Sequence, residues 1–250
     1  MIARMVRTAI LAGAVAGLFA WGLQMAKTVP LILKAEVFEE MAEKAAAEKA
    51  KAAAPVAKEA QPYAHAPGTP AHSHSHTHND GKVWEPENGL ERNAYTLLFS
   101  VLAGVGFAFV LVGGMTLAGR PISWKAGMVW GLAGFAAFYL APAFGLAPEV
   151  PGVAAAEVGH RQAWWIGTAA ATAAGLALIF FARGAAFKAL AVALIVLPHV
   201  IGAPYHAPEP GLVPAALAAE FAVASLVTVG LFWLALGGLV GYFHERSRTA

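Results

Sequence analysis

Residues 197–211 read LPHVIGAPYHAPEPG, and this stretch separates two long apolar segments of the chain. It holds four prolines, two histidines at His199 and His206, and one acid at Glu209. In a lipid bilayer, irregular backbone and polar side chains are costly unless protein or water surrounds them. If the apolar segments are membrane helices, the break is a candidate functional centre and its position decides how the bundle is divided.

The composition of the whole chain indicates a membrane protein. Of its 250 residues, 58% are hydrophobic and 13% are charged, whereas soluble domains carry roughly a quarter charged residues. The charges concentrate in residues 27–92 and in short turns between apolar runs. We therefore expect an all-α, polytopic membrane helix bundle. The chain has no cysteine, which excludes disulfides and thiolate metal sites, and its net charge of +2 gives no indication of a nucleic-acid partner.

Apolar runs predict about six transmembrane helices, with a long polar, histidine-rich outer loop after the first of them. The expected spans cover residues 5–26, 95–118, 123–144, 162–182, 185–201 and 214–242. The fifth span is the weakest, because Lys188 interrupts its start and Pro198 its end. The chain is thus divided into a first span at 1–26, an outer segment at 27–92 and a five-helix bundle at 93–250.

The first run also has the order of a signal peptide, because Arg4 and Arg7 lie at its N-terminal end. It has about 20 uncharged residues, more than the roughly 7–15 residues of a signal-peptide core, so we expect an uncleaved membrane helix. The stretches 13–17 and 127–131 each contain a GxxxG pair, which suits close helix packing. Ser123 is expected to cap the third run.

The outer segment is expected to begin as a polar helix and to continue as a disordered linker. Residues 34–54 are rich in Ala, Glu and Lys, and Glu40 and Lys44 form a favourable i,i+4 pair. Residues 55–90 are too polar and too rich in proline and glycine to build a core.

The linker carries AHSHSHTHNDG at 71–81, which is a candidate metal-binding run. Its alternating histidines are His72, His74, His76 and His78. In an extended chain this spacing puts all four imidazoles on one face, within reach of a single divalent ion once the backbone bends. Neutral imidazole suits cobalt, nickel, zinc and copper, and a falling pH favours release of the metal. The alternative is a polar linker that merely contains many histidines.

At the break, His199 and His206 are candidate metal ligands, with Glu209 at the outer mouth and Glu149 in a second proline-rich loop. Pro198 leaves carbonyl groups one turn earlier without their helical partner, so that the next imidazole could point into the bundle. Borderline divalent metals accept such a mixture of nitrogen and oxygen ligands. A buried histidine bonded to a nearby carbonyl group explains His199 equally well.

The short connections predict the orientation of the bundle. In a six-span topology the basic residues fall on one side: Arg4, Arg7, Arg120, Lys125, Arg183, Lys188, Arg246 and Arg248. Both termini are therefore expected in the cytoplasm, and the histidine run outside. The opposite side holds Glu149, Glu157 and His160, which form either a second outer cluster or a solvated loop.

No GxxxxGK[ST], HExxH or GxSxG sequence occurs, so ATP-binding, metalloprotease and serine-hydrolase functions have no motif to support them. We expect a protein that is not an enzyme and has no permanently bound cofactor. Inward movement of a divalent cation would then need a separate ATPase or the membrane potential, which is worth about 4.6 kcal/mol per ~100 mV.

Five short sequences, spread along the chain, resemble one family. They are PLILKAE at 30–36, ER at 91–92, PEVPG at 148–152, RQAWW at 161–165 and LPHVIGAP at 197–204. In these residues the chain resembles the CbtA-type cobalt transporter subunits of bacteria. The resemblance implies an inner-membrane component of cobalt uptake for cobalamin synthesis. It also implies a small single-span partner, CbtB, which usually carries the histidine-rich tail, so a histidine run in the large subunit departs from the pattern.

The residues and the resemblance together predict uptake of a divalent transition metal, cobalt in the first place, with nickel or zinc as the nearest substrate alternatives. In this hypothesis the outer histidines capture the ion, Glu149 and Glu209 concentrate it, and His199 with His206 binds it at the break. The bilayer, the metal ion and a CbtB-like subunit are the expected partners. The alternative from another class is a non-transporting membrane subunit for metal delivery or assembly.

Overall fold

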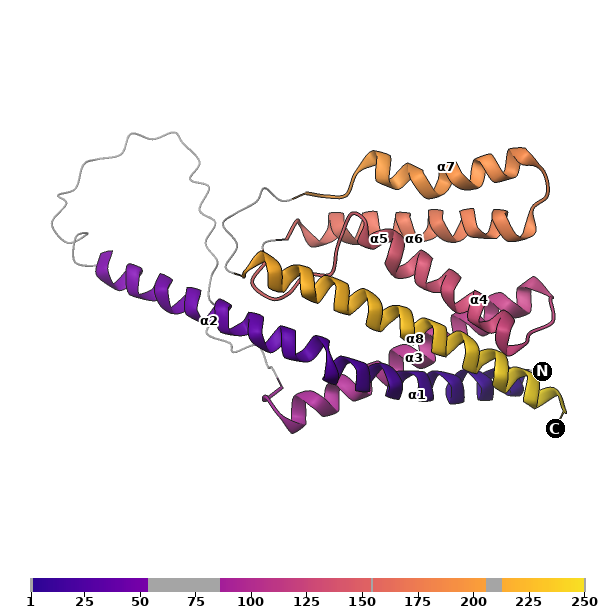
Figure 1. The fold of residues 1–250 in the computed structure, drawn as a ribbon, viewed down its shortest axis with the longest axis horizontal. Coiled ribbons are helices and arrows are strands. Elements are labelled where there is room, and N and C mark those ends of the chain that lie inside the picture. Colours follow the sequence, from indigo (N-terminus) through magenta and orange to yellow (C-terminus); the bar gives the residue numbers. More distant parts are fainter. Residues whose placement is uncertain (1, 54–85, 154, 206–212, 250) are drawn as a thin grey trace, which may run out of the picture.

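The computed structural model describes residues 2–53, 86–153, 155–205 and 213–249, and the regular elements within them are all helices (Figure 1). In chain order they are α1 (Ile2–Ala26), α2 (Thr28–Ala53), α3 (Leu90–Ala118), α4 (Trp124–Phe135), the π-helical segment η2 (Ala136–Leu140), α5 (Ala141–Ala143), α6 (Val158–Phe181), α7 (Ala185–Ile201) and α8 (Ala215–Thr249). The expected all-α class is confirmed.

Five described helices are long and apolar enough to cross a membrane, and α4, η2 and α5 together form one of them, Trp124–Ala143. The apolar α7 has 17 residues and is about 26 Å long, slightly less than a hydrocarbon core of about 30 Å. It runs back alongside α6, and both chain termini lie at the same end of the bundle (Figure 1). The apolar helices, which are α1, α3, α4 with η2 and α5, α6, α7 and α8, therefore run back and forth along the bundle (Figure 1). Five of the six expected spans are long enough to cross a membrane, and α7 is shorter than these five.

Glycines bring the helix backbones into contact at two places. A Cβ atom at Gly13 or Gly17 of α1 would collide with the backbone of α3, and one at Gly127 or Gly131 of α4 would collide with the backbone of α8. The two predicted GxxxG pairs are thus packing sites. In lipid the hydrophobic effect does not favour helix association, so van der Waals contact between the close backbones holds the helices together. Ser123 caps α4, as expected, by accepting a hydrogen bond from the Ala126 N–H at 3.3 Å.

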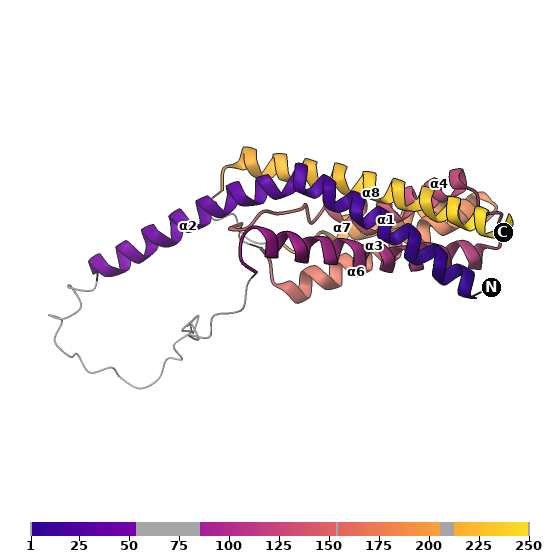
Figure 2. The ribbon, with the colours of Figure 1, turned by 90° about the horizontal axis from the view of Figure 1, so that it is seen from below.

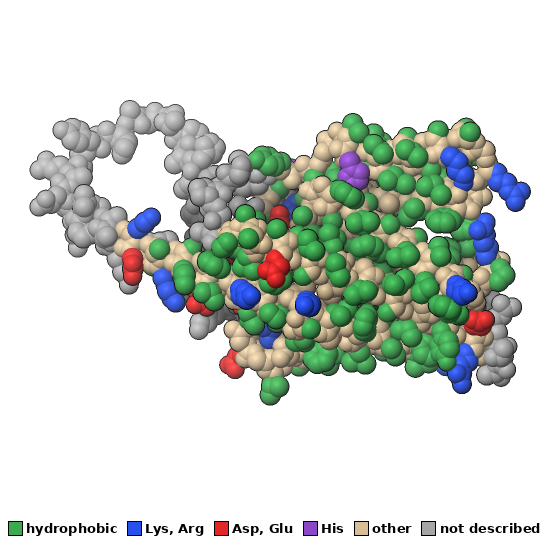
Figure 3. Space-filling view, in the orientation of Figure 1, with side chains coloured by type: hydrophobic (Ala, Val, Ile, Leu, Met, Phe, Trp, Pro, Cys, Tyr) green, Lys and Arg blue, Asp and Glu red, His purple; other side chains and the backbone are tan. Residues whose placement is uncertain are grey.

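The centre of the bundle is aromatic, and its outer surface is apolar. Trp233 of α8 is fully buried and stacks on Phe138 of η2, with ring centroids 5.7 Å apart. Large apolar side chains such as Leu98 and Phe99 on α3 are instead exposed. In Figure 3, hydrophobic side chains cover the visible face along the length of the bundle. This distribution suits a lipid surround.

The polar helix expected at 34–54 is the outer part of α2, which projects beyond the bundle in both views (Figures 1 and 2). It begins earlier than predicted, at Thr28, so that Pro30 lies in its first turn. Proline is tolerated there because the first N–H groups of a helix have no intrahelical partner. Only Lys27 separates α1 from α2, and the Thr28 hydroxyl donates to the carbonyl oxygen of Gln24 at 3.3 Å across this junction.

Two other boundaries differ from the predicted ones. The helix α3 begins at Leu90, five residues before the expected start at 95, because Gly89 with a φ of 109° turns the chain and Glu91 lies in the first turn. The last helix continues to Thr249, well past 242. Residues 55–85 of the expected linker lie outside the described residues.

Candidate functional site

The end of the bundle that holds both termini is basic. Arg4 of α1 donates to the Ser247 carbonyl oxygen of α8 at 3.5 Å. Lys188 donates to the carbonyl oxygen of Leu178, in the last turn of α6, at 3.3 Å and to that of Ala182, which follows the helix, at 3.0 Å. Lysine at a helix C-terminus satisfies carbonyl groups and complements the helix dipole. Figure 3 shows several Lys and Arg side chains gathered at this end.

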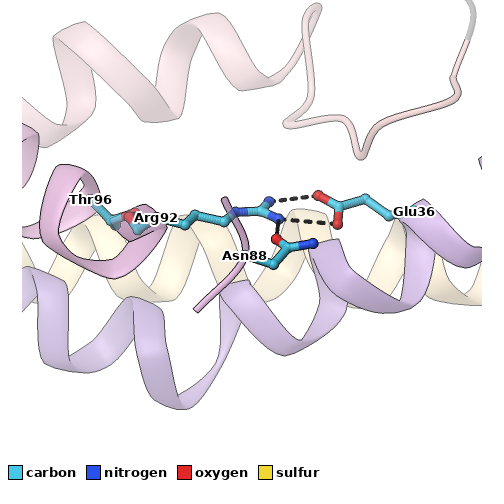
Figure 4. A network of polar contacts seen from close by, with 4 residues as sticks. All are labelled: Glu36, Asn88, Arg92 and Thr96. Carbon is cyan, nitrogen blue, oxygen red and sulfur yellow. Dashed lines mark hydrogen bonds and ion pairs between the residues drawn. The ribbon is translucent and has the colours of Figure 1, made fainter. Parts of the chain in front are cut away.

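The opposite end, which we call the acidic end, is held by two arginine–carboxylate pairs. In the first, Arg92 of α3 donates to both carboxylate oxygens of Glu36 of α2, at 2.6 and 3.1 Å, and to Asn88 Oδ1 at 2.8 Å (Figure 4). The planar guanidinium matches a carboxylate in this two-bond arrangement. The pair docks the base of α2 onto the start of α3. In the sequence, Arg92 stands out only as part of the ER pair at 91–92, and nothing there marks Glu36 as its partner.

In the second pair, Arg161 of α6 donates to Glu149 of the proline-rich loop at 2.9 Å. Both side chains are about one-third exposed, at 31% and 35%. Glu149, a predicted metal-concentrating residue, therefore lies at the acidic end with a cationic partner already beside it.

Glu157 caps the N-terminus of α6. Its carboxylate accepts hydrogen bonds from the N–H groups of Gly159, at 2.8 Å, and His160, at 2.9 Å. These backbone donors lower the pKa of the Glu157 carboxyl below its ordinary value of 4.5. His160 itself is exposed, with Nδ1 3.4 Å from the same carboxylate. Glu157, one of the residues of the second outer cluster, is thus bound to the first turn of the helix that follows it.

His199 lies in the last turn of α7, next to the buried Pro198. Its ring meets Phe144 and Trp164 edge-on, with centroid distances of 6.1 and 5.9 Å. The Trp164 indole N–H donates to the Pro198 carbonyl oxygen at 3.2 Å, which fixes the end of α7 against α6. The half-buried imidazole is therefore held among aromatic side chains.

The structure does not join the predicted ligands into one described cluster. His72, His74, His76, His78, His206 and Glu209 lie outside the described residues. Among the residues that are described, no group of three or more His, Cys, Asp or Glu side chains is placed to hold a metal ion.

A cavity of about 1020 Å³ lies at the acidic end, and we call it the outer cavity. It is bordered by η2, α5, the proline-rich loop and the start of α6, with one residue from α2 and two from α8. Its polar lining consists of Tyr139, Glu149, Arg161 and Gln162. Tyr139 and Gln162 belong to no predicted site in the sequence. Two features of the sequence could have pointed to them: Tyr139 is a lone hydroxyl group in an apolar span, and Gln162 is an amide directly after Arg161.

Comparison with known proteins places the chain in a family. No curated protein and no solved structure matches it. A family model described as the probable cobalt transporter subunit (CbtA) matches residues 2–245, nearly the whole chain. Together with its bundle of apolar helices, this match identifies a multi-pass membrane protein, and the chain belongs to the CbtA family.

Proposed function

We propose that this protein takes up a divalent transition metal, cobalt in the first place, through its helix bundle. The family match carries the proposal, because the family is described as a probable cobalt transporter subunit. The outer cavity supports it, since a large cavity with a carboxylate in its wall is suited to receive a cation.

We infer that the basic end faces the cytoplasm across a bacterial inner membrane. The inference rests on the excess of Lys and Arg in short loops, which remain on the cytoplasmic side during insertion. The acidic end and the histidine run then face the outside, where the metal arrives.

The proposed path starts at His72, His74, His76 and His78, which capture the ion. Glu149 and Glu209 concentrate it at the acidic end, and His199 with His206 binds it at the break after α7. Glu149 is paired with Arg161 at 2.9 Å, so an arriving cation competes with the guanidinium for the carboxylate. This competition keeps binding weak, which suits a residue that must release its ion onward.

The site is tested by replacing both histidines of the break. We expect the His199→Ala/His206→Ala double variant to lose cobalt accumulation in cells at unchanged protein level. His160→Ala, an exposed histidine at the same end, is the matched control and should accumulate cobalt as the native chain does. Native uptake by the double variant would overturn the site.

A second candidate function is that of a membrane subunit for metal delivery or assembly that does not itself transport the ion. The family description fits this function as well, because a subunit of a transporter can deliver metal without moving it across the membrane. Liposomes separate the two functions. Cobalt flux with this chain alone supports transport, whereas flux only with a partner supports delivery or an obligate complex. Competition among cobalt, nickel and zinc in the same assay identifies the preferred ion.

A further inference from the structure

A second cavity, of about 310 Å³, lies inside the bundle where α1, α2, α3, η2 and α8 meet, and we call it the inner cavity. Its polar lining consists of Gln24, Thr28, Ser100, Tyr139, Ser225 and Thr228. All six side chains are uncharged, and they come from five different elements. Hydroxyl and amide groups that converge between membrane helices are costly unless protein, water or a ligand pairs with them.

Half of these groups have no partner in the described part of the chain. Gln24 Nε2 donates to Ser100 Oγ at 3.2 Å, and Thr28 bonds the carbonyl oxygen of Gln24. Among the described residues, no hydrogen-bond partner is found for the hydroxyl groups of Tyr139, Ser225 and Thr228. Thr228 is only 5% exposed. Tyr139 and Ser225 are half-buried. Hydroxyl groups without a protein partner between membrane helices are costly unless water pairs with them, so these three point to water or a hydrated ligand in the cavity.

The inner cavity is next to the outer cavity. Ile32, Tyr139 and Phe221 line both of them. Tyr139 lies in η2, and π-helical segments inside α-helices are frequent at functional sites. The outer cavity, which has Glu149 in its wall, and the neutral oxygen groups of the inner cavity therefore lie on either side of a wall that includes these three side chains.

We propose that the inner cavity is a binding station for the hydrated divalent cation on its way through the bundle, an inference that rests on the proposed transport function. None of the described residues that line this cavity is a His, Asp or Glu. The ion therefore keeps its water molecules, and the oxygen atoms of the lining accept hydrogen bonds from them. The volume corresponds to about ten waters at roughly 30 Å³ each, enough for a cation inside an octahedral shell. Neutral groups bind such an ion weakly, which lets it leave again.

The inference is tested by thiol labelling, because the native chain has no cysteine. Ser225→Cys places one thiol in the inner cavity of the purified full-length protein, and Ser100→Cys is the second variant should the first not fold. Thr172→Cys is the matched control, since Thr172 is 3% exposed in α6 and lines neither cavity. Each thiol is treated with a small cationic thiol reagent, with and without cobalt.

We expect Ser225→Cys to react and cobalt to protect it. At a cobalt concentration of about ten times the Kd from the same titration, the reaction should slow about tenfold. Thr172→Cys should react slowly in both conditions. The inference is overturned if Ser225→Cys is as unreactive as the control, or if cobalt leaves its reaction rate unchanged. If cobalt protects the thiol but cells do not take up cobalt, the binding station is supported and the transport function is overturned. If cells take up cobalt but the thiol is not protected, transport is supported and the binding station is overturned.

Discussion

At the level of single residues, the carboxylates of the acidic end have different partners. Glu36 and Glu149 each pair with an arginine, and Glu157 accepts two backbone N–H groups. These contacts join segments that the chain separates, such as α2 and α3, which are linked by Arg92 and Glu36 across 56 positions. Such partners depend on the folded arrangement, so a single sequence could place the charges but not pair them.

Glu36→Gln should loosen the base of α2. The pair with Arg92 is bidentate and less than one-third exposed, so its loss should cost about 1 kcal/mol. This corresponds to about a fivefold larger undocked population, measured as faster tryptic cleavage at Lys34. Glu40→Gln is the control, because its pair with Lys44 is 68% and 75% exposed. Equal cleavage of the two variants would contradict the prediction.

Glu157→Ala should destabilise the start of α6 in a pH-dependent way. The pKa of this carboxyl is lowered in the folded protein, so its stabilising effect is complete above the unfolded value of about 4.5 and is lost as the pH falls through the folded pKa. The difference in unfolding temperature between native protein and variant should be present at neutral pH and shrink in acid. A difference that persists unchanged well below the ordinary carboxyl pKa argues against the cap.

At the level of elements, hydropathy predicted the class, the order of the spans and the short α7. Helix packing was predicted only in part: the GxxxG pairs marked the contact faces, but not that α1 meets α3 and α4 meets α8. The segment η2 has no periodicity signal of its own. The inner cavity was also missed, because single Ser and Thr residues are ordinary in apolar helices and only the folded bundle brings them together.

Gly104→Ala should be much more damaging than Gly106→Ala, although the two positions are neighbours on α3. A Cβ atom at Gly104 would collide with the backbone of α1 at Gly13, whereas one at Gly106 meets nothing within 4 Å. Overpacking at the first site should cost about 1–3 kcal/mol, while the second change should be neutral or gain up to about 1 kcal/mol from helix propensity. Thermal unfolding in detergent measures both. Similar unfolding temperatures would show that α1 and α3 do not touch here.

At the level of the whole molecule, the two ends differ in charge, and this difference predicts the orientation in the membrane. His160→Cys places a thiol at the exposed acidic end, and Arg183→Cys places one at the exposed basic end. In intact cells, an impermeant maleimide should label the first variant and reach the second only after lysis, because basic loops stay inside. The reverse pattern would invert the proposed direction of uptake.

The projection of α2 sets the distance from the lipid surface at which the next segment begins. From Glu36, which is clamped at the acidic end, to the end of the helix at Ala53, α2 extends about 26 Å. The headgroup layer and one Debye length together take up roughly 18 Å. A helix that runs along the membrane normal from a Glu36 at the hydrocarbon boundary would carry the chain beyond the ion atmosphere of the anionic lipids. At that distance the concentration of a cation equals its concentration in bulk solution. We therefore expect the affinity with which the protein captures the metal to be insensitive to the surface charge of the membrane.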